Sequence, residues 1–196
     1  MAKYYLRLLL LVAAFIGILL LCERMLPRDY DFQQTVEIDR PAAEIFPYLN
    51  SLNKWPQWSQ QFNMNKHENL VIKYNGTEEG VGAAQTWTEI RGSGKLWITE
   101  SVPNESLTLE QEFYVFPKMT STFAIEPNGE NKTVVTWRST GQLPSTPLYG
   151  IANVTNVYET QMEYFYEESI AGLKACLLYT SPSPRDQRGS RMPSSA

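Results

Sequence analysis

The sequence predicts an α+β protein in which a seven-stranded antiparallel sheet curves around one long C-terminal helix. One transmembrane helix is expected before this domain. Three observations lead to this prediction: an uncharged N-terminal run, a series of strand-like segments divided by turn residues, and one long amphipathic segment after them. Strands that follow one another roughly every 8–12 residues are typical of an antiparallel meander.

The N-terminal segment, residues 1–24, is expected to be a membrane anchor. Residues 8–22 carry no charge, and the apolar run from Tyr4 to Cys22 is nineteen residues long, interrupted only by Arg7. A spanning helix needs about 20 such residues. A cleaved signal peptide and a buried helix are the alternatives, but no small-x-small cleavage motif follows the run. We therefore expect an uncleaved anchor through residues 4–22.

The basic residues around the anchor predict its orientation. Lys3, Arg7 and the amino terminus precede the run. The charges that follow it nearly cancel, namely Glu23, Arg24, Arg28, Asp29 and Asp31. The positive-inside rule places the N-terminus in the cytoplasm and the domain outside it, in the periplasm if the source is bacterial.

The folded domain is expected over residues 35–175, after a linker at 25–34. A first strand at 32–39 precedes two short helices at 42–49 and 51–61. Six further strands are expected, each ended by turn residues, at 69–74, 83–90, 95–101, 107–113, 120–126 and 132–140.

The last expected element of the domain is a helix at 148–175. Its apolar side chains recur every three or four residues, as Ile151, Val154, Tyr158, Met162 and Phe165. This segment is the one candidate for covering a face of the sheet. One helix cannot fill a curved sheet completely, so we expect a cavity between them.

The C-terminal segment, residues 176–196, reads as a Ser/Pro-rich disordered tail with no apolar period. A sharper interpretation is available. CLLYTSPSPRD at 176–186 and GSRMPSSA at 189–196 resemble the two halves of a translated sequencing adapter, in the right order. We interpret this segment as a non-native assembly artefact and leave it out of the fold.

Charge and cysteine content narrow the function classes. The whole chain has a formal charge of −4, but residues 25–175 hold 11 basic and 19 acidic residues and therefore carry −8. This acidity disfavours binding of nucleic acid and docking onto anionic lipid. Both cysteines, Cys22 and Cys176, lie outside 25–175. The domain is thus expected to have no disulfide, thiol nucleophile or thiolate metal site.

No sequence motif for a metal, a cofactor or a catalytic triad is present. His67 is the one histidine, lies in a polar loop, and is expected to be solvated. No HExxH or paired Cys/His pattern occurs, and no glycine cluster has the strand–GxGxxG–helix context of a dinucleotide site. We expect no metal and no cofactor.

Four stretches together resemble the SRPBCC (START-like) superfamily, which includes polyketide cyclase/dehydrase, lipid-transport and birch-pollen-allergen-like proteins. They are VEIDRPAAEIFPYL at 36–49, NKWPQWS at 53–59, EEGVGAAQTW at 78–87 and FAIEPNGENKTVVTW at 123–137. The resemblance covers about 35–175. It implies a helix-grip fold and a pocket for a lipid, polyketide, sterol or similar ligand. It does not supply a reaction, because such folds host binders, carriers and enzymes.

The candidate ligand-binding residues are aromatic or apolar side chains of the expected strands and helices: Trp55, Trp58, Trp87, Trp97, Phe123, Val135, Trp137, Tyr158, Met162 and Phe165. The alternative is that they only fill the core. Glu89 shares strand parity with Trp87, so it is either a cavity acid or base or, with the parity reversed, a solvated charge.

Three functions remain open. The favoured one is membrane-tethered binding or transport of a hydrophobic molecule, lipid-like, polyketide-like or quinone-like, because the domain lacks a nucleophile and a metal site. The second is a cyclase or dehydratase acting through Glu89. The third is a stress-related protein-interaction module, which would need an exposed apolar patch.

Overall fold

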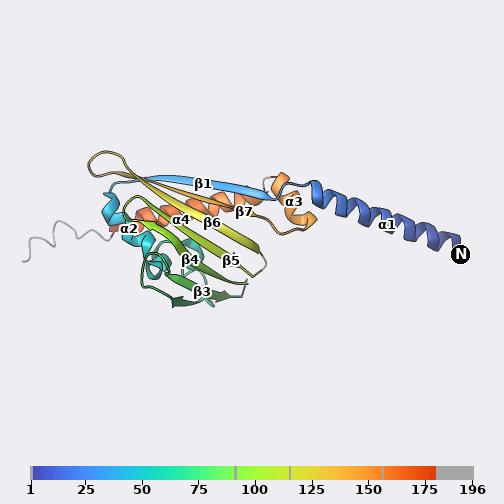
Figure 1. The fold of residues 1–196 in the computed structure, drawn as a ribbon, viewed down its shortest axis with the longest axis horizontal. Coiled ribbons are helices and arrows are strands. Elements are labelled where there is room, and N and C mark those ends of the chain that lie inside the picture. Colours follow the sequence, from blue (N-terminus) through green and yellow to red (C-terminus); the bar gives the residue numbers. More distant parts are fainter. Residues whose placement is uncertain (1, 91, 115, 156, 180–196) are drawn as a thin grey trace, which may run out of the picture.

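The fold is that of a single antiparallel sheet covered on one face by a long helix (Figure 1). In this computed structural model, residues 2–90, 92–114, 116–155 and 157–179 are described. The strands are β1 (Asp29–Ile38), β2 (Val71–Asn75), β3 (Ala84–Glu89), β4 (Gly92–Val102), β5 (Ser106–Phe113), β6 (Phe116–Pro127) and β7 (Thr133–Gln142). The helices are α1 (Ala2–Met25), α2 (Ala42–Asn50), α3 (Pro147–Val154) and α4 (Val157–Tyr179), with short 3-10 turns η1 (Leu52–Gln57) and η2 (Gln60–Phe62).

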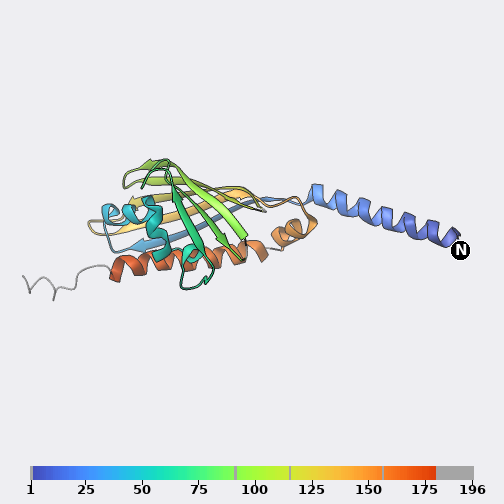
Figure 2. The ribbon, with the colours of Figure 1, turned by 90° about the horizontal axis from the view of Figure 1, so that it is seen from below.

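The strand order is β1-β7-β6-β5-β4-β3-β2, and every neighbouring pair is antiparallel. The six C-terminal strands form the predicted meander, and β1 closes it beside β7. Bulges interrupt the register between Ile98 and Glu100 and between Gln111 and Phe113. Bulges bend the strands that carry them, which suits a sheet that arches over α4 (Figure 2). The predicted fold class is confirmed.

Strand alternation places one set of side chains against α4. Leu107 and Leu109 of β5 are fully buried, as are Phe123 of β6 and Val135 of β7. From α4, the buried side chains recur at helical spacing, as Tyr166, Ser169, Ile170, Leu173 and Leu177. The core therefore lies between the inner face of the sheet and one stripe of α4.

We call the end of the domain where β1 begins the anchor-proximal end, and the opposite end the distal end. At the distal side, α2 and η1 fill the core. The Trp55 indole Nε1–H donates to the Leu49 carbonyl at 2.9 Å, and Trp58 Nε1–H donates to the Tyr48 carbonyl at 3.1 Å. Both tryptophans are buried with their polar atoms satisfied, which makes this corner rigid.

The expected linker at 25–34 is much shorter in the structure. β1 begins at Asp29, paired with Gln142, so only residues 26–28 connect it to α1. Tyr30 and Phe32 both point inward and are buried, and this alternation extends the strand further towards the N-terminus than predicted.

The expected single helix at 148–175 is divided into α3 and α4. Ile151 and Val154 belong to α3, where their side chains are 54% and 55% exposed, so they do not continue the buried stripe. At the other end, α4 runs on to Tyr179, and Leu177 is buried. Residues 176–179 are thus the last turn of α4 and not part of a disordered tail. The rest of the predicted tail lies outside the described residues.

α1 extends away from the domain, and its described side chains are exposed (Figure 1). Its segment Lys3–Leu21, nineteen residues, is long and apolar enough to cross a membrane. A cleaved signal sequence would meet the same criterion.

α4 approaches the Trp58 backbone closely at Gly172, and substituting this glycine tests the contact. A Cβ at this position would lie 2.4 Å from the Trp58 carbonyl oxygen. Alanine is the better helix former by about 1 kcal/mol, yet we expect Gly172→Ala to destabilise the domain by about 1–3 kcal/mol, because α4 must move outward. Denaturant unfolding measures the change. Ala171→Gly, at an exposed position of α4, measures the difference in helix propensity alone. A Gly172→Ala variant that is more stable than the native chain would contradict the close contact with Trp58.

Candidate ligand-binding cavity

A cavity of about 360 Å³ lies between α4 and the anchor-proximal part of the sheet. This volume is within the range of small-molecule sites, roughly 300–1,000 Å³. Its lining is mostly aromatic and apolar, with three glutamines: Tyr30, Gln61, Gln111, Phe113, Met119, Trp137, Tyr158, Gln161, Met162, Phe165 and Tyr166. The cavity is the space that one helix leaves unfilled beneath a curved sheet.

Strand register brings the sheet side of the cavity together. Tyr30 and Met119 both pair with Gly141 in β7, one from each side, and Met119 also pairs with Gln111 of β5. A Cβ on Gly141 would lie 2.4 Å from the Tyr30 Oη, so the tyrosine ring occupies the space that a larger residue would fill. The helix side comes from Tyr158, Met162 and their neighbours one or two turns apart on α4.

An aromatic cluster separates the cavity from the filled distal core. Trp137 stacks on Phe123 with ring centroids 4.9 Å apart and meets Tyr166 edge-on at 4.1 Å. Trp58 also contacts Trp137 edge-on, with ring centroids 6.1 Å apart. Trp137 therefore forms the inner wall of the cavity.

Two buried donors beside the cavity have no partner among the described residues. Gln111 Nε2 donates to Gln61 Oε1 at 3.1 Å, which leaves Gln61 Nε2 unpaired. Trp137 Nε1 is also buried and unpaired. A buried unsatisfied donor costs about 1–3 kcal/mol. Both side chains line the cavity, so a bound molecule with an acceptor oxygen is suited to satisfy them.

A buried hydroxyl cluster adjoins the same wall. The Tyr166 hydroxyl lies 3.7 Å from the Met119 sulfur, and the Ser121 and Ser139 hydroxyls are hydrogen-bonded to each other. Burial raises the pKa of Tyr166 to about 12, although the hydroxyls of Ser139 and Ser121 act in the opposite direction. Burial also raises the pKa values of Tyr30 and Tyr158. These tyrosines are therefore neutral hydroxyl groups at physiological pH.

Of the ten predicted ligand-binding residues, Trp137, Tyr158, Met162 and Phe165 line the cavity. Five others pack in the core without lining it: Trp55, Trp58, Trp87, Phe123 and Val135. Trp97 lies on the outer face of β4, between the inward-facing Leu96 and Ile98, with the Lys95 ammonium 4.2 Å from its ring centroid. Trp97 therefore cannot reach the cavity, because its strand parity points it away.

The lining residues that sequence reasoning missed are Tyr30, Gln61, Gln111, Phe113, Met119, Gln161 and Tyr166. The alternation of Tyr30 with Phe32 is a signal that could have placed Tyr30 on the inner face. Tyr166 falls one turn after Met162, which could have extended the stripe. The glutamines carry no such signal, since glutamine side chains are ordinarily solvent-facing.

Glu89 has the same strand parity as Trp87 but lies outside the cavity lining. Its Oε1 is 3.0 Å from His67 Nδ1, and His67 Nε2 is 3.1 Å from the Gln60 carbonyl oxygen. Both side chains are only 15% exposed. The prediction of a solvated His67 is therefore wrong, because the loop folds back on the end of β3. The pair joins this loop to the sheet and holds the Glu89 carboxylate outside the cavity.

Among the described residues, no three His, Cys, Asp or Glu side chains converge as a metal site would require. The chemistry that the cavity offers is apolar contact, neutral hydroxyls and amide donors. It suits binding of a largely apolar molecule.

The raised pKa of Tyr166 predicts a loss of stability at alkaline pH. Its unfolded pKa is 10.0 and its folded pKa about 12. Its stabilising contribution is therefore complete below pH 10 and is lost as the pH rises towards 12. We expect the unfolding free energy of Tyr166→Phe to fall less steeply than that of the native chain across this interval. Urea unfolding measures this, with exposed Tyr164→Phe as the control, and equal slopes would contradict burial of the hydroxyl.

Comparison with known proteins agrees with this architecture. The family model described as polyketide cyclase / dehydrase and lipid transport matches residues 30–177. A search of curated proteins finds no match.

Solved structures with the same fold include three bacterial proteins. TTHA0849 from Thermus thermophilus superposes with a TM-score of 0.58 at 14% identity, covering 78% of this chain and 100% of that one. The Aha1 dimer from Colwellia psychrerythraea superposes with a TM-score of 0.54 at 14% identity, covering 76% of this chain and 96% of that one. XoxI from Bacillus cereus superposes with a TM-score of 0.54 at 14% identity, covering 76% of this chain and 95% of that one. At these identities the likeness shows the fold alone.

The family match begins at the inward-facing Tyr30 and ends at the buried Leu177, so it spans both walls of the cavity. The chain belongs to the polyketide cyclase/dehydrase and lipid-transport family of the SRPBCC superfamily.

Proposed function

We propose that this protein is a membrane-tethered carrier or sensor that binds a hydrophobic small molecule, lipid-like, polyketide-like or quinone-like, beneath α4. The observation that carries the proposal is the cavity of about 360 Å³, walled by Trp137, Tyr158 and Met162. The family match supports it, because the family is described by lipid transport as well as by cyclase and dehydrase chemistry.

The unpaired donors narrow the ligand class. Gln61 Nε2 and Trp137 Nε1 both favour an acceptor oxygen on the ligand. The neutral tyrosine hydroxyls can donate or accept. We therefore propose an apolar molecule that carries at least one carbonyl, carboxyl or ether oxygen towards the inner wall.

The anchor completes the proposed arrangement. We propose that residues 4–22 stay in the mature protein and span the membrane, with the N-terminus cytoplasmic and the domain extracytoplasmic. Lys3 and Arg7 before the run and the nearly balanced charges after it support this orientation.

The acid–base alternative has no observation that favours it. It requires Glu89 beside the ligand, whereas its carboxylate is hydrogen-bonded to His67 at the end of β3. Glu89→Gln is therefore expected to leave ligand affinity unchanged, which makes it a useful control.

Filling part of the cavity should weaken ligand binding. We expect Met162→Trp to weaken binding of a dansyl-labelled fatty acid by about tenfold, since displacing two methylene groups costs about 1.6 kcal/mol at 0.8 kcal/mol each. Dansyl emission, excited directly, measures the affinity with the full chain held in amphipol. Tyr164→Trp places the same side chain on the exposed face of α4. Equal weakening by both variants, or no binding by the native chain, would refute the cavity as the site.

The anchor is tested on the full chain in its membrane fraction. An uncleaved spanning helix resists extraction by alkaline carbonate and keeps residues 1–24 in the mass of the mature protein. A protease added from outside should remove the domain only in spheroplasts, where the extracytoplasmic face of the membrane is accessible. A soluble product that lacks the first 22 or so residues would identify a cleaved signal instead.

A further inference from the structure

The anchor-proximal end of the domain carries a group of exposed apolar side chains on separate segments. Ile90 and Tyr114, at the turns after β3 and β5, are 84% and 86% exposed. Ile151 and Val154 of α3 and Val157 of α4 are each more than half exposed. From this grouping we infer that the anchor-proximal end lies against the bilayer that holds α1, and that ligand passes directly between bilayer and cavity. The inference rests on the proposed membrane anchor.

Strand direction explains why these segments share one end. β1 starts at the anchor and runs away from it, and each neighbour in the sheet runs antiparallel to the last. The β3–β4 and β5–β6 turns therefore return to the end where β1 begins. Both views show these turns on the side of the domain that faces α3 and the start of the anchor (Figures 1 and 2).

The connection to α1 is too short to let this end move far from the membrane. Residues 26–28 span about 10 Å at most. α3 is also fastened to this connector. Asn153 Nδ2 donates to the Pro27 and Asp29 carbonyls, at 3.0 and 3.3 Å, and a Cβ on Gly150 would lie 2.7 Å from Leu26 Cδ1. A spanning α1 thus holds α3 at the surface of the bilayer.

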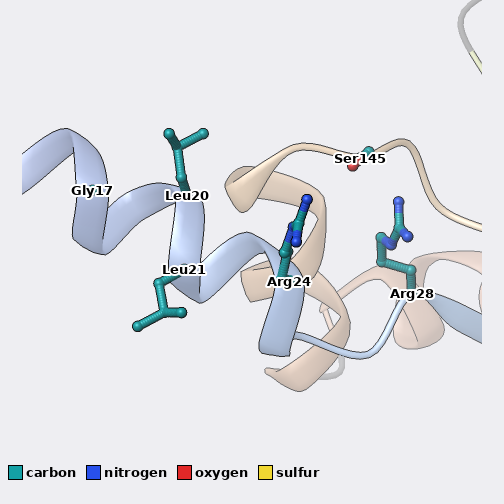
Figure 3. Close-up of a pocket in the computed structure, with 6 residues that line it drawn as sticks. All are labelled: Gly17, Leu20, Leu21, Arg24, Arg28 and Ser145. Atoms are coloured by element: carbon teal, nitrogen blue, oxygen red, sulfur yellow. The ribbon is translucent and has the colours of Figure 1, made fainter.

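The polar groups at this junction suit lipid headgroups. A hollow of about 630 Å³ lies between α1 and the loop before α3. Figure 3 shows Arg24 and Arg28 projecting towards that loop near Ser145, with Leu20 and Leu21 one turn earlier in the helix. Neither guanidinium forms an ion pair among the described residues. Guanidinium groups bind phosphate bidentately, so the phosphate of a membrane phospholipid fits here with its acyl chain beside the leucines.

This docking does not depend on anionic lipid. Residues 25–175 carry a charge of −8, which an anionic surface repels. The exposed group is instead apolar, with a tyrosine at one turn, and such side chains partition into the interface of neutral membranes.

The cavity lies beside the docked face. Phe113 and Tyr158 line it, and each is adjacent in sequence to a member of the exposed group, Tyr114 and Val157 respectively. A molecule leaving the cavity at this end enters the hydrocarbon region without crossing bulk water. This arrangement suits a ligand that is itself stored in the bilayer.

Spin labels on the full chain in phosphatidylcholine vesicles test the docking. Cys22→Ser and Cys176→Ser remove the native thiols, and single cysteines at 90, 114 and 81 carry the label. Val81 is 57% exposed at the distal end and serves as the matched control. We expect labels at 90 and 114 to collide more with oxygen and less with an aqueous nickel complex than the label at 81. Equal, water-like collision rates at all three positions would overturn the docking.

A transfer assay tests the consequence. Ile90→Glu with Tyr114→Glu is expected to slow movement of the dansyl fatty acid from vesicle to protein by about an order of magnitude, with affinity in amphipol unchanged. Val81→Glu should alter neither. A normal transfer rate for the double variant would overturn the inference. Tight binding in amphipol would still support the proposed function in that case. Absence of amphipol binding would instead refute the cavity, and failure of the chain to float with vesicles would refute the anchor and the docking together.

Discussion

The structure depends on one geometric constraint: a single helix has to cover the inner face of a seven-stranded curved sheet. Its buried stripe, centred on Tyr166, Ile170 and Leu173, fills the distal half of that face together with α2 and η1. At the anchor-proximal half, α4 and Gln61 of η2 leave the face incompletely covered, and the cavity remains there. The proposed ligand site is thus a consequence of the way the core is incompletely filled.

Trp137 lies at the boundary between these two halves. It stacks on Phe123 on the core side and lines the cavity on the other. Because the distal corner is rigid, through the satisfied indoles of Trp55 and Trp58, the wall that a ligand meets is preorganised. The same asymmetry puts the cavity next to the segment proposed to enter the membrane. The proposed carrier would thus load and unload where an apolar ligand is soluble.

The fold class could be predicted because its signals are local: turn residues end each strand, and apolar spacing distinguishes strand from helix. The site was predicted only in part. Trp97 is a residue type that is common in pockets, yet its position on β4 turns its side chain outward. Which face it occupies depends on the register of β4 with β3 and β5. Tyr30 falls in the expected linker; its alternation with Phe32 indicates a strand, but its pairing with Gly141 arises only in the sheet. Glu89 and His67 come together because a loop folds back, which no spacing reveals.

By itself, the sequence determined the anchor-like run, the order of strands and helices, the absence of cysteine from residues 25–175 and the family. These features reside in composition and short-range periodicity, which act within a few residues along the chain. The tertiary structure decided which aromatic side chains face the cavity, where the core is left unfilled and which turns return to the anchor. Those properties arise from contacts between segments far apart in sequence, and burial depends on the neighbours that such contacts bring.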